Sequence, residues 1–187
     1  GRIQLTDPVG GSGSYLYSRD GGVSWQGSGM FSNLPVGTYD IRIRDAATPT
    51  CVITLDPSLV INQPEILNAS VSGTNITCFG GNDGTITITG ATGGHGNYEY
   101  SVNGGGSWQL AGSFTNLTPG SYNVLLRDAA YQGCIIVLDN AFVLTQPGLL
   151  SATVTKTDVS CNGDNDGTIT ISSPAGGYGT YEYSRDG

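Results

Sequence analysis

The sequence is poor in basic residues and has no long apolar run. Its 187 residues include seven Lys and Arg against fifteen Asp and Glu, which gives a formal net charge of −8. A nucleic-acid-binding protein needs a basic face to meet phosphates, so this balance argues against one. No apolar run approaches the roughly 18 residues of a membrane helix, and we therefore expect no membrane span in this segment.

Side chains for catalysis are equally scarce. A hydrolase or transferase needs a nucleophile with a base, or a pair of acids in a cleft. The chain has one histidine, His95, and one lysine, Lys156. We expect His95 to lie in a solvated loop and assign no role to Lys156. The sequence thus predicts no enzyme, no catalytic residue and no cofactor.

The sequence is rich in glycine and tyrosine, and it repeats itself. Thirty glycines and ten tyrosines accompany 37% hydrophobic residues, which indicates a folded, turn-rich chain. The chain matches itself at one offset of 83 residues without a gap, and 32 of its first 67 residues are identical to their counterparts in 84–150. We expect residues 1–67 to be a repeat without its first strand, 68–150 a complete repeat, and 151–187 the start of a third. The chain would then be a window of a longer tandem array.

Short alternating segments predict an all-β unit. In each, apolar and polar side chains alternate, or a short apolar run is bounded by turn residues, as in strands. These segments are 66–71, 85–89, 98–102, 122–127, 135–138 and 142–144. In 122–127 we expect Tyr122, Val124 and Leu126 to face inward. No segment shows a 3.6-residue period. The sequence predicts tandem Ig-like β-sandwich domains of about seven short strands each, with an 83-residue repeat.

Two kinds of turn support this fold. Asn103-Gly104 and its copies Asp20-Gly21 and Asp186-Gly187 follow a strand and predict tight hairpins, because these residues tolerate positive φ. Tyr122 and its copy Tyr39 come just after a turn and begin an alternating strand. That position resembles the tyrosine corner, where the chain of a sandwich crosses between sheets.

Several motifs follow one another along the complete unit. They are Cys78 to Gly84, Gly93-Gly94 with Tyr98-Glu99-Tyr100, Leu117 with Gly120-Ser121-Tyr122, Arg127-Asp128 running to Gly133-Cys134, and Gln146-Pro147. On these motifs the unit resembles the SprB repeat, a family found in very large surface adhesins of gliding bacteria. The resemblance implies export to the bacterial cell surface and a role in adhesion or gliding motility.

We therefore expect a segment of a long extracellular repeat adhesin that acts as stalk and adhesion module. Stacked sandwiches add reach, and an acidic surface keeps such stalks soluble. The expected partners are a polysaccharide or other surface ligand and the neighbouring repeats of the same chain. One alternative is a structural subunit of a self-associating extracellular filament, which exposed apolar residues repeated at 83-residue intervals would favour. Another is an accessory carbohydrate-binding module.

Trp25 and Trp108 are the candidate ligand contacts. Each follows a flexible glycine turn, where an aromatic ring can stack on a sugar or anchor an interface. The alternative is that each ring covers one edge of its sandwich core. Asp83, Asp164 and Asp166 form only fragments of a calcium loop, so we interpret these segments as turns and expect no metal site.

The four cysteines predict disulfides in an exported protein. One pairing joins Cys78 to Cys134 within a unit and leaves Cys51 and Cys161 to partners outside the chain. The other joins Cys51 to Cys78 and Cys134 to Cys161 across adjacent units. We favour the first, because the strand after Cys78 and the strand before Cys134 should begin and end at one pole of the sandwich. The second requires the chain to double back at Gln146-Pro147.

Overall fold

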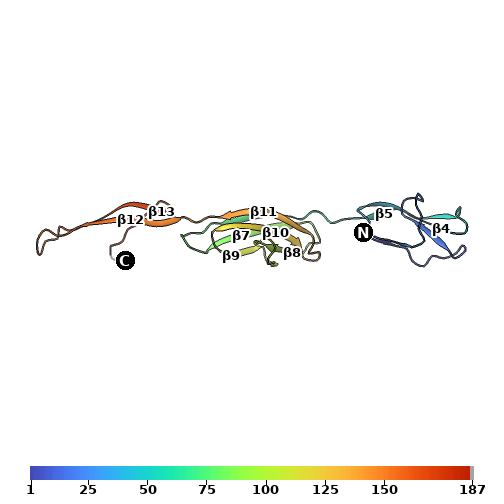
Figure 1. Cartoon of the computed structure of the whole chain (residues 1–187), viewed down its shortest axis with the longest axis horizontal. Coiled ribbons are helices and arrows are strands. Elements are labelled where there is room, and N and C mark those ends of the chain that lie inside the picture. The colour runs from blue at the N-terminus through green and yellow to red at the C-terminus, as the bar shows by residue number, and fades with distance from the viewer. Residues whose placement is uncertain (186–187) are drawn as a thin grey trace. The chain divides into compact units, whose positions relative to one another are not determined.

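The structure, a computed structural model, describes residues 1–185 of the chain and is all-β (Figure 1). Its strands belong to two compact units, which divide between Pro64 and Glu65. In the described residues no helix is long and apolar enough to cross a membrane. The prediction of all-β sandwich domains is confirmed.

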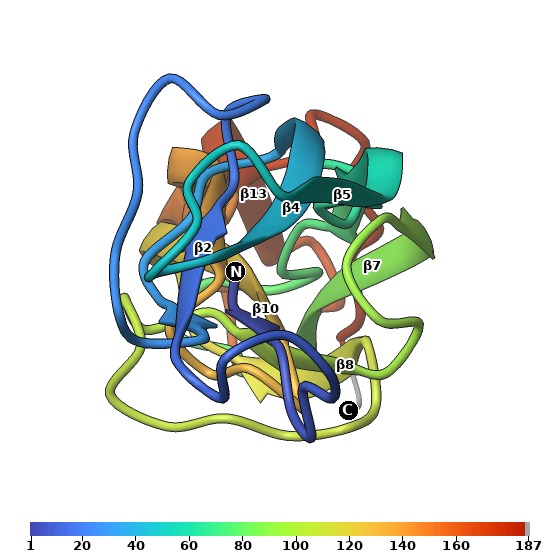
Figure 2. The ribbon, with the colours of Figure 1, turned by 90° about the vertical axis from the view of Figure 1, so that its right-hand side faces the viewer.

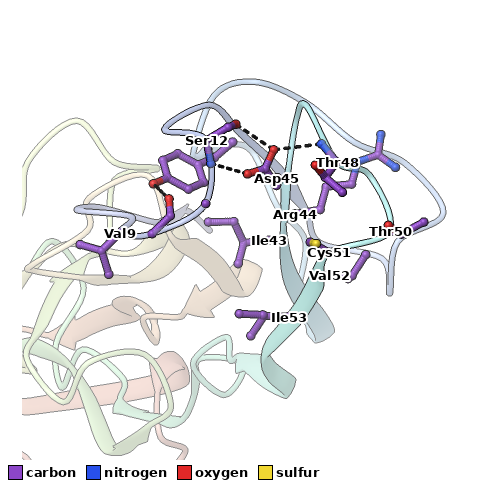
Figure 3. Close-up of a pocket in the computed structure, with 13 residues that line it drawn as sticks. Val9, Ser12, Ile43, Arg44, Asp45, Thr48, Thr50, Cys51, Val52 and Ile53 are labelled. Atoms are coloured by element: carbon purple, nitrogen blue, oxygen red, sulfur yellow. Dashed lines mark hydrogen bonds between the residues drawn. The ribbon is translucent and has the colours of Figure 1, made fainter.

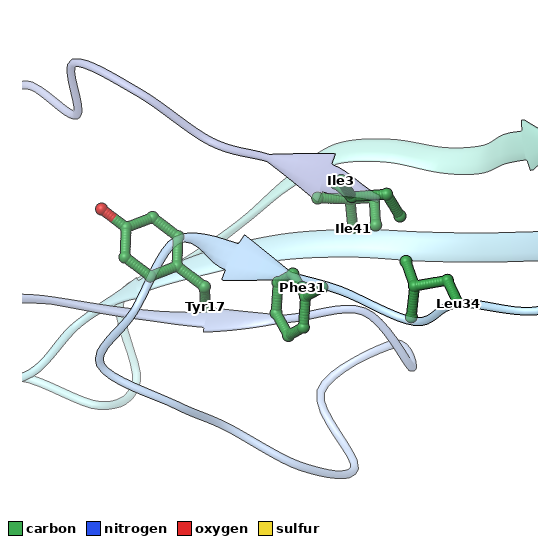
Figure 4. Close-up of a cluster of buried hydrophobic side chains, with 5 residues drawn as sticks. All are labelled: Ile3, Tyr17, Phe31, Leu34 and Ile41. Atoms are coloured by element: carbon green, nitrogen blue, oxygen red, sulfur yellow. The ribbon is translucent and has the colours of Figure 1, made fainter. Parts of the chain in front are cut away.

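Unit 1, residues 1–64, is built from two small antiparallel sheets. Its strands are β1 (Ile3–Gln4), β2 (Tyr15–Ser18), β3 (Met30–Phe31), β4 (Gly37–Asp45) and β5 (Val52–Ile61). β1 pairs with β3, while β4 lies between β2 and β5 (Figure 2). Both sheets supply the buried cluster of Ile3, Tyr17, Phe31, Leu34 and Ile41 (Figure 4). The core of unit 1 is therefore the space between its two sheets.

Unit 2, which begins at Glu65, contains a fuller version of the same sandwich. Its strands are β6 (Asn68–Thr74), β7 (Gly84–Thr92), β8 (Tyr98–Ser101), β9 (Ser113–Leu117), β10 (Gly120–Asp128) and β11 (Ile135–Leu144). One sheet has the order β6-β7-β9 and the other β8-β10-β11. The two sheets enclose Ile76, Ile86, Ile88, Val124 and Leu144. The sandwich contains six strands where the sequence predicted about seven.

A further hairpin follows this sandwich within unit 2. β12 (Gly148–Thr157) pairs antiparallel with β13 (Thr168–Gly177). Their sequences correspond to β6 and β7 with the 83-residue offset. The hairpin thus contains the two leading strands of the repeat.

The predicted tyrosine corner is confirmed in both copies. The Tyr122 hydroxyl donates to the carbonyl oxygen of Thr118 at 2.7 Å, and the Tyr39 hydroxyl to that of Pro35 at 2.8 Å. A hydrogen bond to the backbone a few residues upstream is the defining contact of this corner. It fixes the start of β10 and of β4 against the turn that precedes each strand.

The prediction of a tight hairpin at Asn103-Gly104 was wrong. Positive φ angles occur one residue later, at Gly104 (68°) and Gly105 (89°). The Asn103 side chain instead accepts a hydrogen bond from the backbone of Ser107 and one from the hydroxyl of buried Ser101. Asn103 therefore stabilises a longer loop through its side chain. The Asp20-Gly21 turn in unit 1 has the same form, and Asp186-Gly187 lies outside the described residues.

The inward positions of β10 were only partly predicted. Val124 and Leu126 are fully buried, as expected, but Leu125 between them is buried too. The pairing of β10 with β11 shifts register on both sides of Val124. A bulge of this kind breaks strict alternation and lets consecutive side chains point to buried positions.

Candidate functional site

The two candidate tryptophans occupy equivalent, half-buried positions. The Trp25 Nε1 donates to the carbonyl oxygen of Gly22 at 2.8 Å, and the Trp108 Nε1 to that of Gly105 at 3.0 Å. Each indole therefore closes the glycine turn that precedes it.

An arginine stacks on each of these rings. The Cζ of Arg44 lies 4.3 Å from the Trp25 ring centroid, and that of Arg127 lies 4.2 Å from the Trp108 centroid. Both distances are in the range of a cation–π interaction. The tryptophans were candidates from the sequence, but this stack was not predicted, although Arg44 and Arg127 recur at the 83-residue offset as the tryptophans do.

The two arginines differ in their second partner. In unit 2 the Arg127 Nε donates to the Glu99 carboxylate at 2.6 Å, and both side chains are largely buried. In unit 1 the residue at the place of Glu99 is Leu16. The Arg44 Nε is consequently a buried donor without a hydrogen-bond partner.

A buried aspartate organises the end of unit 2 where β10 stops. The Asp128 side chain is fully buried and accepts from the His95 backbone at 2.7 Å, the His95 Nδ1 at 2.8 Å, and the backbones of Ala130 and Tyr131. Burial alone would raise the pKa of Asp128, but these hydrogen bonds, led by the His95 side chain, lower it to about 2. The His95 ring also lies 4.3 Å from the Tyr131 ring. His95 therefore has a structural partner that sequence reasoning missed.

Asp45 is the counterpart in unit 1 and uses smaller partners. Its carboxylate accepts from the Ser12 backbone and hydroxyl and from the backbones of Ala47 and Thr48. These hydrogen bonds, the backbone bond of Ser12 first, lower the pKa of Asp45 to about 2. The turn is thus held in the same way in both units, by a serine hydroxyl in one and an imidazole in the other.

A cavity of about 490 Å³ lies beside Asp45 (Figure 3). Ile43, Val52 and Ile53 contribute apolar side chains to its wall, and the same wall includes Ser12 and Thr48. In unit 2 the residues at the places of Ser12 and Thr48 are the stacked His95 and Tyr131. The two units therefore differ here in side-chain size: Ser12 and Thr48 are small, whereas His95 and Tyr131 are large.

The acidic turns hold backbone and hydroxyl groups in place. Asp83 accepts from the Thr77 hydroxyl and backbone, and these hydrogen bonds lower its pKa. Ser160 makes equivalent bonds, from its backbone to Asp166 and from its hydroxyl to Asp164. In residues 1–185 no three His, Cys, Asp or Glu side chains gather as the ligands of a metal ion would.

The cysteines are free in this structure, and all four are exposed. The premise behind the predicted pair of Cys78 and Cys134 was wrong. The start of β10 at Gly120 pairs with Leu144, near the turn that contains Cys78, whereas Cys134 follows the far end of β10. A strand of nine residues separates those ends by roughly 27 Å, well beyond the reach of a disulfide.

Comparison with known proteins identifies the family to which the repeat is similar. Residues 70–107 and 153–185 match the family model of the SprB repeat. The two matches begin 83 residues apart, which is the period of the sequence. No curated protein and no solved structure matches the chain. SprB repeats occur in surface adhesin-like proteins of gliding bacteria. The chain therefore carries SprB repeats, which confirms the family that its motifs resemble.

Proposed function

We propose that this chain is a stalk and adhesion segment of an extracellular adhesin that serves gliding motility. The observation that carries the proposal is the SprB match at the same point of two successive 83-residue periods. On this proposal the chain is not an enzyme and works through its surface, outside the cell.

The cores of the two units support the stalk role. The cluster around Ile41 lies wholly in unit 1 and the cluster around Val124 wholly in unit 2. A sandwich with its own core can act as a spacer in a chain of similar sandwiches. The net charge of −8 disfavours non-specific association of such spacers.

The direct test uses antibodies raised against the 187-residue chain. They should label intact cells of the source bacterium, and their Fab fragments should slow attachment or gliding on a surface. Labelling that needs permeabilised cells would contradict the extracellular location. Surface labelling without any effect of the Fab on attachment or gliding would contradict the adhesive role.

Ligand contact is proposed for the half-buried indoles of Trp25 and Trp108. The purified chain should bind an immobilised polysaccharide, and the double variant Trp25→Ala/Trp108→Ala should lose that binding. Trp25→Phe/Trp108→Phe is the matched control, because it keeps an aromatic face and removes only the indole donor. If the alanine variant binds as well as the unaltered chain, the adhesive surface does not include the two tryptophans and lies elsewhere on the unit.

A structural filament is the second candidate, and one observation favours it. β5 and β11 are edge strands of their sheets, and both expose apolar side chains at the 83-residue interval. Val52 and Ile135 are 42% and 49% exposed, and Val60 and Val143 are 55% and 58% exposed. Exposed apolar edge strands promote lateral pairing of chains. Val60→Lys/Val143→Lys should abolish lateral bundles in electron micrographs if filaments form through these edges.

A further inference from the structure

A cleft of about 400 Å³ lies beside Trp25 in unit 1. Pockets that bind small ligands usually have volumes of about 300–1,000 Å³. Its wall combines Trp25 with Tyr17 and Phe31, two aromatic residues of the buried cluster of the unit (Figure 4). The same wall has polar side chains, from Arg19, Ser24, Gln26 and Ser32. The cleft therefore offers both aromatic and polar groups to a ligand.

The cleft is formed within one sandwich, where β2 and β3 lie. Their counterparts in unit 2, β8 and β9, are outer strands of the sheets β11-β10-β8 and β6-β7-β9. The leading strand of the repeat, β6, is the outer strand at the other end of its sheet. The surface beside the tryptophan is thus made by strands and a loop in the middle of the repeat.

Backbone hydrogen bonds hold the loop of Trp25 against β2. The Tyr17 backbone donates to the Gln26 carbonyl oxygen at 2.8 Å, and the Gln26 backbone donates to the Tyr17 carbonyl oxygen at 3.0 Å. Tyr100 and Gln109 make the same two bonds in unit 2. The frame around the tryptophan is therefore formed before a ligand arrives, and a ligand that binds there does not have to order the loop.

Arg19 gives this cleft a positive charge. Among residues 1–185, no Asp or Glu lines the cleft with it. Its exposed side chain lies over the Phe31 ring, with the Cζ 5.9 Å from the ring centroid, and it forms no ion pair with any residue that the structure describes. The neighbouring Asp20 carboxylate accepts instead from Ser18 and Ser24. The guanidinium is thus open to a carboxylate from a ligand.

The corresponding surface of unit 2 lacks this charge. Val102 stands at the place of Arg19 and packs against the core of its unit. The third copy has an arginine again, Arg185. The aromatic residues are the same in unit 2, where they are Tyr100, Trp108 and Phe114. The repeats therefore share an aromatic frame and differ in the charge beside it.

We propose that the cleft beside Trp25 binds an acidic sugar residue of a polysaccharide, with the sugar ring against the indole and its carboxylate on Arg19. A guanidinium pairs with a carboxylate through two parallel hydrogen bonds, which gives this contact its selectivity. The Ser32 hydroxyl in the same wall can donate to or accept from a sugar hydroxyl. The inference rests on the ligand contact proposed for Trp25 and names the class of sugar that it takes.

The acidic net charge of the chain does not prevent this contact. Exposed charges that lie further apart than the Debye length, about 8 Å at physiological ionic strength, are largely screened from one another. The charge closest to a sugar in the cleft is that of Arg19, so its attraction outweighs the repulsion from distant carboxylates.

The test is a fluorescence titration of the chain with Trp108→Phe, in which Trp25 is the remaining indole. The probes are an oligogalacturonate and its methyl ester, which keeps the sugar rings and removes their charge. The acid should bind roughly tenfold more tightly than the ester, because it adds a charge-assisted hydrogen bond. Added salt should weaken binding of the acid and leave binding of the ester unchanged.

Two variants in this background locate the charge that recognises the acid. Arg19→Gln should make the acid and the ester bind alike. Arg42→Gln is the matched control, because it removes the same charge from unit 1 at a residue that pairs with Asp40 and does not line the cleft. Arg42→Gln should therefore keep the preference for the acid.

Unit 2 provides a second control within the same chain. With Trp25→Phe, the fluorescence of Trp108 reports on the surface that has Val102 in place of the arginine. This surface should not distinguish the acid from the ester. An equal preference for the acid at Trp108 would overturn the role of Arg19.

The remaining outcomes separate this inference from the proposed ligand contact. Equal binding of acid and ester at Trp25, a preference that Arg19→Gln leaves unchanged, or binding of neither probe overturns the acidic-sugar site. None of these results contradicts ligand contact by the tryptophans, which their double alanine variant tests. If calorimetry finds that Trp25→Ala still prefers the acid and Arg19→Gln does not, the contact by the indole is wrong and the role of Arg19 is supported.

Discussion

Arg44 and Arg127 occupy the same place in two copies of one fold, yet their surroundings differ. Both stack on a tryptophan at little more than 4 Å, but only Arg127 has a carboxylate partner, from Glu99. The Arg44 Nε is buried and unpaired, because Leu16 stands at the place of Glu99. The part that both copies keep is the stack, and the ion pair is an addition. The repeat thus keeps the arginine–indole contact in both copies, including the copy in which the arginine Nε has no hydrogen-bond partner.

The comparison can be measured because each unit contains one tryptophan. Trp25 reports on unit 1 and Trp108 on unit 2, so replacing one of them with phenylalanine leaves fluorescence that follows the other unit. Chemical denaturation followed by this fluorescence measures the free energy of unfolding of one unit at a time.

The largest effect is expected in the core of unit 2. Ile86→Ala removes a fully buried side chain and should cost about 2–5 kcal/mol, from lost burial and the cavity left behind. Its counterpart Ile3 is 7% exposed and lies in the two-residue strand β1, so Ile3→Ala should cost less. Equal losses in the two units would contradict the view that Ile3 is held less tightly than Ile86.

The next-largest loss of stability is expected when the ion pair between Arg127 and Glu99 is removed. Glu99→Leu leaves the Arg127 Nε unpaired, as Arg44 is in unit 1, and should destabilise unit 2 by about 1–3 kcal/mol. Glu99→Gln keeps an acceptor and should cost less. The reverse change, Leu16→Glu, should stabilise unit 1 by up to about 1 kcal/mol. If Leu16→Glu destabilises unit 1, a partner for Arg44 is not what that unit lacks.

The tyrosine corner should respond equally in both units. Tyr122→Phe and Tyr39→Phe each remove one hydroxyl-to-carbonyl hydrogen bond, of 2.7 Å and 2.8 Å. Each change should cost about 1 kcal/mol, since the rings remain and only the hydrogen bond is lost. A much larger loss in one unit would show that the two corners are not equivalent.

The smallest difference between the units is expected in acid. The pKa of Asp45 and that of Asp128 are both about 2 in the folded chain, below the ordinary value of about 3.9 in the unfolded chain. The folded state therefore gains stability that is fully present above pH 4 and is lost as the pH falls towards 2. Both units should lose stability over that range, as followed by acid titration of the fluorescence.

A control distinguishes the contribution of the Asp128 carboxylate to the acid dependence from that of other acidic groups. Asp128→Asn should flatten the acid dependence of unit 2 and leave that of unit 1 unchanged. A lower stability of Asp128→Asn at neutral pH with the same dependence between pH 4 and 2 would assign the acid effect to another group.

Local features of the sequence predicted most of the fold. The alternation in 85–89 and 122–127 gave β7 and β10, and the position of Tyr122 after its turn gave the corner. The turn at Asn103-Gly104 was misplaced, because an asparagine side chain can organise a longer loop by accepting from the backbone beyond it. The bulge at Val124 was not predicted, since nothing in the alternating pattern reveals a register shift.

The 83-residue period, the all-β class and the family could be read from the sequence alone, because repeats, alternation and turn residues are local patterns that need no knowledge of contacts. Which distant residues meet became visible only in the folded chain. It joined His95 to Asp128, placed Arg127 on Trp108, and separated Cys78 from Cys134 by the length of β10. These outcomes depend on the direction and register of strands far apart in the chain. A spacing in the sequence does not contain that information.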